Sequence, residues 1–166
     1  DAQILSFIHL GWTASIDGAQ WIWGDNPVAD PTVVETQTFV KTFNWNGPVT
    51  DATINIASDN GYVVTVNGHE EANVTDENNF TTATQDTIAI PTGDIVQGSN
   101  TVEIAVTNSA TPSDSDPTHN PAGLLYKLTV TGSNPNCMTR PSNTITVVKG
   151  FDGEAPSEWS FEFNSG

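Results

Sequence analysis

Apolar and polar residues alternate along much of this chain, and turn-forming residues interrupt the alternation at short intervals. The clearest stretch is residues 52–68, ATINIASDNGYVVTVNG. Its alternating apolar positions are Ile54, Ile56, Tyr62, Val64 and Val66. A period of two is typical of a strand with one buried face, and Asx–Gly sequences are typical of tight turns between strands. We therefore expect two antiparallel strands folded about Ser58-Asp59-Asn60-Gly61, with a second turn at Asn67-Gly68.

The same kind of pattern recurs along the chain, and we expect no helix. Strands are predicted at residues 4–10, 19–23, 36–44, 52–57, 62–66, 87–90, 101–108, 124–131, 144–149 and 158–163. Short, regularly spaced strands separated by Gly, Pro, Asn and Asp favour two packed sheets over a parallel α/β fold. The sequence therefore predicts an all-β protein, a two-sheet antiparallel β-sandwich. In such a fold Val102, Ile104 and Val106 face the core, and Glu103 faces solvent.

Several short motifs follow one another along residues 11–130. They are Trp21-Ile22-Trp23, Asp59-Asn60-Gly61-Tyr62, Val66-Asn67-Gly68, Gly98-Ser99-Asn100-Thr101-Val102 and Asn120-Pro121-Ala122-Gly123-Leu124-Leu125. This series resembles the jelly-roll sandwiches of the galactose-binding-like superfamily, which occur as accessory domains of extracellular glycosidases and as modules of bacterial surface proteins. The resemblance implies a jelly roll whose role is recognition or construction rather than catalysis.

The chain is strongly acidic: 20 Asp and Glu residues against four Lys and Arg give its 166 residues a formal net charge of −16. Such a charge opposes binding to nucleic acid or to an anionic membrane and makes cations the natural partners. No apolar run in the sequence is long enough to span a membrane. We therefore expect no nucleic-acid partner and no membrane insertion.

The sequence gives little support to catalysis. It contains no Gly-x-Ser-x-Gly, Cys-x-x-Cys or His-Glu-x-x-His motif and no phosphate-binding glycine loop. The histidines, His9, His69 and His119, are scattered, and the adjacent Glu70 and Glu71 would point to opposite faces of a strand end. We therefore expect a protein that is not an enzyme and has no catalytic residues.

The composition changes after Thr131. Residues 132–136 have the composition of a linker, so we expect a jelly-roll domain at residues 1–131 and an extension of linker and strands at residues 132–166. The strands predicted at 144–149 and 158–163 resemble the opening two strands of the transthyretin-like repeats of bacterial surface proteins.

The last predicted strand carries three aromatic residues on one face, namely Trp159, Phe161 and Phe163. Burying each such side chain stabilises a fold by about 1.5–3 kcal/mol, so this face needs a cover. The cover is the chain's own sandwich, a neighbouring subunit that accepts the strand, or a downstream domain. The apolar strand that contains Ile4 and Phe7 is the other candidate for donation to a neighbour.

The acidic loop at residues 111–120 is the candidate metal site. Asp114, Asp116, His119 and Asn120 lie within seven residues of one another. Oxygen ligands at that density suit a structural calcium ion. The spacing is not that of an EF-hand, because the required Gly and the Glu at the twelfth position are missing. A solvated acidic loop without a metal is the alternative.

The tryptophans near the start of the chain are the candidate carbohydrate platform. Trp12, Trp21 and Trp23 are accompanied by Asp59 and Asn60 at the predicted turn, and a sugar site needs both aromatic and polar groups. The alternative is structural. Trp21 and Trp23 alternate and would share one face, as core residues do, and turn chemistry alone explains Asp59 and Asn60.

Two Asn-x-Thr triplets begin at Asn73 and Asn79 and match the acceptor pattern for N-linked glycans. Both lie in a polar segment that we expect to be exposed. Such triplets also arise by chance in a chain rich in Asn and Thr.

Together these features predict a secreted, extracellular module of a cell surface with a structural or adhesive role. Its partners would be other copies of itself or other surface-protein domains, and strand donation would make it the subunit of a pilus-like filament. The alternative function is a carbohydrate-binding module of a larger secreted enzyme. Structural calcium is the only cofactor for which we identify a candidate site.

Overall fold

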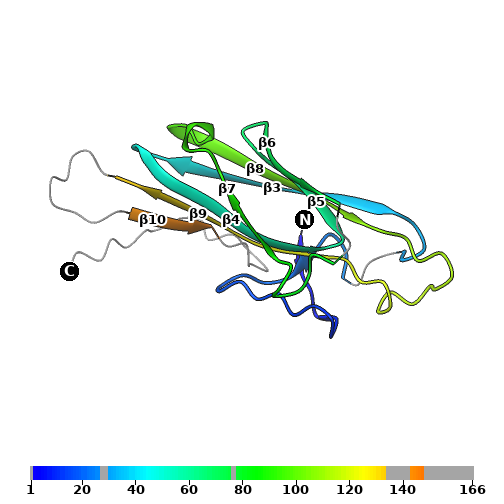
Figure 1. Cartoon of the computed structure of the whole chain (residues 1–166). Helices are drawn as coiled ribbons and strands as arrows, with labels where there is room; N and C mark the ends of the chain where they lie inside the picture. Colours follow the sequence, from blue (N-terminus) through cyan, green and yellow to red (C-terminus); the bar gives the residue numbers. More distant parts are fainter. Residues whose placement is uncertain (1, 27–29, 76–77, 134–142, 148–166) are drawn as a thin grey trace.

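The computed structural model describes residues 2–26, 30–75, 78–133 and 143–147, and the last of these segments is described by its backbone alone. Two antiparallel sheets pack face to face, with no α-helix in the described residues (Figure 1). The strands are β1 (Gln3–Ile4), β2 (Ile22–Trp23), β3 (Glu35–Trp45), β4 (Val49–Asp59), β5 (Gly61–Val66), β6 (His69–Val74), β7 (Asp86–Ala89), β8 (Gly98–Asn108), β9 (Gly123–Gly132) and β10 (Asn143–Val147). A short 3₁₀ turn, Thr92–Asp94, follows β7. The predicted all-β sandwich is confirmed.

One sheet has six strands and the other has four. The six-stranded sheet has the order β1-β2-β9-β4-β7, with β10 also paired to β9, and the four-stranded sheet has the order β3-β8-β5-β6. Across the described residues, no helix has the length and apolar character that a membrane crossing requires.

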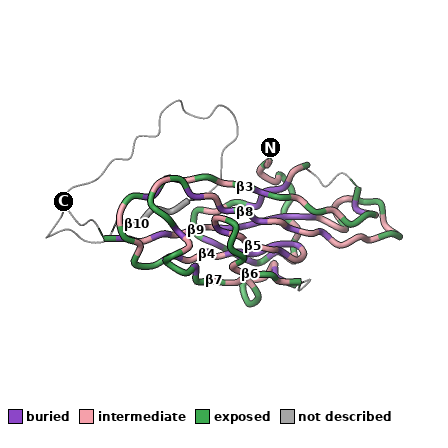
Figure 2. Tube along the Cα trace, turned by 90° about the horizontal axis from the view of Figure 1, so that it is seen from above, coloured by how far each residue is buried: buried purple, intermediate pink, exposed green. Residues whose placement is uncertain are grey.

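The core lies between the sheets and is built by alternation, which Figure 2 shows as buried residues recurring along the strands. On β8, Val102, Ile104 and Val106 are buried while Glu103 is exposed, as predicted. Trp23 is completely buried, and the centroid of its ring lies 5.7 Å from the ring centroid of Phe39. The inner faces of both sheets therefore supply one continuous apolar core.

A second, smaller apolar cluster lies on the outer face of the six-stranded sheet. Its buried members are Trp12, Ala14, Ile16, Trp21, Ala57 and Leu125. The two strand residues, Ala57 of β4 and Leu125 of β9, are direct register partners. The N-terminal segment that covers them is the blue chain below the sheet in Figure 1. The sandwich thus carries a partial third layer.

The predicted hairpin about residues 58–61 is wrong. Only Asn60 separates β4 from β5, yet β4 pairs with β9 and β7, whereas β5 pairs with β8 and β6. Alternation identifies a strand but does not encode its partner, and both edges of β4 are occupied by strands distant in sequence. The chain therefore crosses from one sheet to the other at Asn60.

The turn at Asn67-Gly68 does form a hairpin, but its second strand, β6, was not predicted. Asn67 and Gly68 have φ values of 50° and 83°, as a two-residue hairpin turn with positive φ at both positions requires. The β6 sequence, HEEANV, lacks clear alternation because β6 is the edge strand of its sheet and carries charge. A bulge between Val64 and Thr65 further breaks the register.

Both N-terminal strands are shorter than predicted. β1 ends at Ile4 and β2 begins at Ile22, because the chain between them leaves the sheet to build the outer cluster. At the other end, β10 overlaps the strand predicted at 144–149 and pairs with the chain's own β9, Asn143 opposite Gly132. The strand predicted at 158–163 lies outside the described residues.

Candidate functional site

Trp12 and Trp21 stack on each other over the outer face of the six-stranded sheet. Their ring centroids are 4.4 Å apart with an interplanar angle of 28°. They are only 6% and 7% exposed. Gly123 of β9 lies against both rings, and a Cβ at that position would stand 2.7 Å from Cη2 of Trp12. The pair is therefore closed by packing and offers no open platform.

Trp23 lies apart from this pair. It belongs to the main core, whereas Trp21 belongs to the outer cluster, so the predicted common face is wrong. The reason is that β2 begins at Ile22, and strand alternation does not extend to Trp21. The expectation that Trp21 and Trp23 are buried in apolar clusters is correct.

A hydrogen-bond network surrounds the crossing at Asn60. Nε1 of Trp12 donates to Oδ2 of Asp59 at 2.8 Å, and Nδ2 of Asn60 donates to Oδ1 of Asp59 at 2.7 Å. The backbone N–H of Ser109 donates to Oδ1 of Asn60 at 2.6 Å. The structure therefore brings together Trp12, Trp21, Asp59 and Asn60, as predicted for a site, but in contacts that fix the fold.

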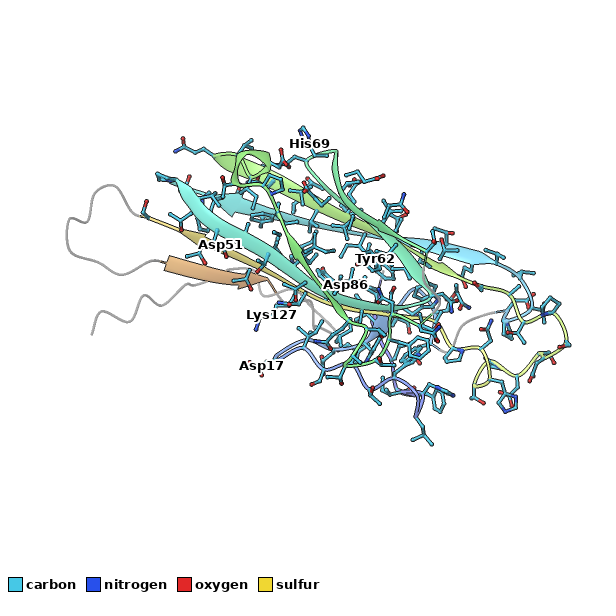
Figure 3. All side chains as sticks on the ribbon, in the orientation of Figure 1. Asp17, Asp51, Tyr62, His69, Asp86 and Lys127 are labelled. Atoms are coloured by element: carbon cyan, nitrogen blue, oxygen red, sulfur yellow. The ribbon has the colours of Figure 1, made fainter. Side chains whose placement is uncertain are left out.

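A second network lies beside the first. The hydroxyl of Tyr62 donates to Oδ2 of Asp86 at 2.7 Å, and Nδ2 of Asn79 donates to the same oxygen at 2.8 Å. Figure 3 shows Tyr62 and Asp86 close together. Oδ1 of Asn79 accepts the backbone N–H of Ser58 at 2.9 Å. The pKa of Tyr62 lies far above its usual value, mainly because the side chain is buried. The hydrogen bond to Asp86 raises this pKa further.

The two Asn-x-Thr triplets differ in the exposure of their asparagines. Asn79 is 2% exposed and both ends of its amide are hydrogen-bonded, so the expectation that it is exposed is wrong. Asn73 on β6 is exposed, as predicted. Asn79 is therefore a structural residue.

The acidic loop closes on itself. Oδ1 of Asp114 accepts the backbone N–H of Asp116, and Oδ2 of Asp114 lies 2.8 Å from Nδ1 of His119. Asn120 turns away, because its Nδ2 donates to the backbone oxygens of Pro31 and Ser109. No group of three or more His, Cys, Asp or Glu side chains is placed to hold a metal ion in the part of the chain that the structure describes. Calcium stays a prediction.

Hydrogen bonding also shifts the pKa values of this loop. The pKa of Asp114 is lowered mainly by the hydrogen bond from the backbone N–H of Asp116. The hydrogen bond with His119 lowers it further. The backbone and hydroxyl groups of Thr118 lower the pKa of Asp116. The hydrogen bond to Asp114 raises the pKa of His119. The loop is thus held by charge-assisted contacts at neutral pH.

The residues predicted for strand donation are only partly described. Ile4 is paired with Ile22 and packs against the main core. Phe7 lies beyond β1 and is 39% exposed. Trp159, Phe161 and Phe163 lie outside the described residues, and their role stays a prediction.

An open groove of about 390 Å³ lies on the four-stranded sheet. Its lining is Thr36, Asn60, Gly61, Tyr62, Val63, Asn73, Val74, Thr75, Ala105, Thr107 and Ser109. Except for Asn60, these residues were not predicted as site residues. Tyr62 was expected on the buried face of its strand, and the outward positions of a strand are normally solvated. A signal was present in the sequence: the outward positions Thr36, Val63, Ala105 and Thr107 lack charge in a strongly acidic chain.

Comparison with known protein families finds no match, and comparison with curated proteins finds none. Solved structures do match. The α-L-rhamnosidase of Streptomyces avermitilis, complexed with L-rhamnose, aligns with a TM-score of 0.57 and 23% identity over 81% of this chain and 12% of that chain. The α-L-rhamnosidase of Aspergillus terreus aligns with a TM-score of 0.56 and 17% identity, over 80% of this chain and 16% of that chain.

A lectin from Pleurotus ostreatus in complex with GalNAc aligns with a TM-score of 0.53 and 22% identity, over 78% of this chain and 34% of the lectin chain. At these identities the likenesses show a common fold. This chain therefore shares a β-sandwich fold with parts of two rhamnosidases and a lectin, and it spans 12–34% of their lengths. The expected β-sandwich agrees with this result, while the galactose-binding-like resemblance and the transthyretin-like resemblance of the tail stay predictions.

Proposed function

We propose that this chain is a non-catalytic carbohydrate-binding module of a larger extracellular protein. The observation that carries the proposal is its fold likeness to a lectin solved with GalNAc and to parts of two rhamnosidases. The matched part is 12% and 16% of the rhamnosidase chains, which is the size of an accessory domain and not of a complete enzyme.

The placement of two carboxylates, Asp59 and Asp86, also supports a non-catalytic role. Asp59 and Asp86 accept hydrogen bonds from Trp12, Tyr62 and Asn79, and neither carboxylate lines the groove. A glycosidase needs two carboxyl groups held across a substrate cleft. Asp59 and Asp86 therefore act as structural acceptors.

The proposal is tested with the chain of residues 1–166. A glycan array of neutral and sulfated oligosaccharides is probed first, and the best binder is titrated by isothermal titration calorimetry. We expect saturable binding to at least one glycan and no hydrolysis of it. Absence of binding across the array would contradict the proposal.

A second candidate function is assembly at a cell surface, which was the main prediction from the sequence. Exposed apolar residues favour it: Phe7 is 39% exposed, Ile8 41% and Leu10 96%, all on the segment that follows β1. Exposed apolar side chains that lie together mark contact sites for other chains. Light scattering after size-exclusion chromatography distinguishes the two functions, because assembly predicts concentration-dependent oligomers and a binding module predicts a monomer.

A further inference from the structure

We infer that the groove on the outer face of the four-stranded sheet binds a neutral oligosaccharide. The inference rests on the proposed function and gives it a site. Val63 of β5 and Ala105 of β8 are direct register partners and line the groove. Their side chains point away from the core, because the residues before and after each of them are buried. They form an apolar floor on the solvent side of the sheet.

Hydroxyl and amide groups surround this floor. On one side, Oγ1 of Thr36 lies 2.8 Å from Oγ1 of Thr107. On the other side, the exposed Asn73 of β6 is the register partner of Val63. Hydroxyl and amide groups both donate and accept hydrogen bonds, as the hydroxyls of a sugar do, and an apolar floor suits the C–H groups of a sugar ring.

The absence of charge selects the class of ligand. None of the residues that line the groove is Asp, Glu, Lys, Arg or His, although the chain contains 20 acidic residues. Without a basic residue, the groove offers no ion pair to a sulfate or a carboxylate. The net charge of −16 further repels an anionic glycan. A neutral glycan needs no ion pair and is not repelled by the negative charge of the chain.

The groove is also the more accessible of the two candidate surfaces. Trp12 and Trp21 are buried in their stack, whereas the groove is open to solvent and has the volume of a small-molecule site, which is about 300–1,000 Å³. Tyr62 lines the groove, but it is 2% exposed and its hydroxyl is bound to Asp86. Hydrogen bonds, rather than ring stacking, therefore account for recognition.

The test compares two variants that introduce the same side chain on the same sheet face. Ala105→Arg places a guanidinium in the groove, and Thr42→Arg places one at an exposed position of β3 outside it. The probe is the best neutral binder from the array, titrated against each purified chain. We expect Ala105→Arg to weaken binding at least about tenfold, equivalent to ~1.4 kcal/mol, and Thr42→Arg to change it less than about twofold.

Asn73→Ala is the second variant, and it decides the question if Ala105→Arg fails to fold. Asn73 is exposed, so its replacement leaves the core intact and is expected to weaken binding about tenfold. If the wild-type chain binds a neutral glycan and both groove variants bind it equally well, the inference is overturned while the proposed function stands. Preference for a sulfated over the matched neutral glycan overturns the inference as well. If the wild-type chain binds no glycan, the proposed function itself fails.

Discussion

The indole Nε1 of Trp12 donates a 2.8 Å hydrogen bond to Oδ2 of Asp59, across 47 positions of sequence. Both residues are buried. The bond ties the N-terminal segment, which covers the outer face of the six-stranded sheet, to the end of β4, where the chain crosses to the other sheet. A second link comes from Lys127 of β9, whose Nζ donates to the backbone oxygen of Asp17 at 2.9 Å (Figure 3).

Replacing Trp12 with Phe is expected to destabilise the fold through the loss of this donor. A hydrogen bond to a charged group contributes about 1.5–3 kcal/mol, and a buried carboxylate that loses one of its donors is destabilised. We expect the free energy of unfolding, measured by urea denaturation, to fall by about that amount. Trp21→Phe is the control, because it removes similar ring area from the stacked pair and leaves the hydrogen bond of Trp12 to Asp59 in place. Equal losses in the two variants would show that the hydrogen bond contributes nothing beyond ring area.

Gly123→Ala is expected to disrupt the same region by steric overlap. Its Cβ would stand 2.7 Å from Cη2 of Trp12 and 3.0 Å from Cε3 of Trp21, and overpacking costs about 1–3 kcal/mol. The control is Gly93→Ala, because a Cβ at Gly93 meets nothing within 4 Å. Thermal unfolding followed by tryptophan fluorescence compares them. A Gly123→Ala variant as stable as wild type would mean that the rings shift freely.

The fold predicted from sequence was correct where side chains alternate across a sheet. In β8, Ile104 and Glu103 already reveal the inner and outer faces, because the pleat places successive side chains on opposite sides. Pairing was not predictable, since the partners of β4 lie far along the chain and alternation contains no information on them. The adjacency of β4 and β5 in sequence was therefore misleading.

The candidate site was less predictable than the fold. The sequence singled out Trp12 and Asp59 and the structure does bring them together, but their burial depends on residues 5–21 leaving the sheet, which no local pattern indicates. The groove depends on the registers of β3, β8, β5 and β6, and β6 was missed because it is polar. A surface built from four strands can be identified only after their order is known.

Tyr126 is expected to make the protein sensitive to alkali. Burial raises the pKa of Tyr126 to about 12, whereas an unfolded tyrosine ionises near its ordinary value of 10.0. The folded state therefore holds its proton more tightly, so this stability is fully present below pH 10 and is lost as the pH rises toward 12. The loss amounts to about 2–3 kcal/mol. In alkaline unfolding curves, Tyr126→Phe should show a shallower decline than wild type, and parallel curves would contradict the prediction.

His119 is expected to titrate above its ordinary pKa of 6.5, because it is hydrogen-bonded to Asp114. The contact stabilises the loop below pH 6.5 and is lost as the pH rises through the raised pKa. NMR titration of the imidazole measures this directly. Asp114→Asn should lower the pKa of His119 toward its usual value, while Asp25→Asn, a carboxylate distant in sequence, serves as the charge control. An unchanged titration in Asp114→Asn would disprove the contact.

The predicted calcium site at Asp114, Asp116 and Asn120 makes a separate prediction. Calcium bound by these oxygens would raise the melting temperature and would lower the pKa of His119, since it replaces the imidazole at Asp114 and adds positive charge beside it. Melting curves with calcium chloride and with a chelator provide the measurement. Identical curves would leave the loop as the solvated alternative.

Glu71 is expected to weaken the fold at neutral pH. Burial, followed by the nearby charge of Asp94, raises the pKa of Glu71, and one of its carboxyl oxygens is buried without a hydrogen-bond partner among the described residues. The folded state therefore favours the protonated form, so this contribution is present below pH 4.5 and is lost as the pH rises through the raised pKa. Glu71→Gln mimics the protonated acid and should raise the melting temperature by roughly 1–3 °C at pH 7. Glu70→Gln removes the same charge from an exposed neighbour, so the two variants should differ at pH 7. An equal effect of both variants at pH 7 would attribute the gain to net charge alone.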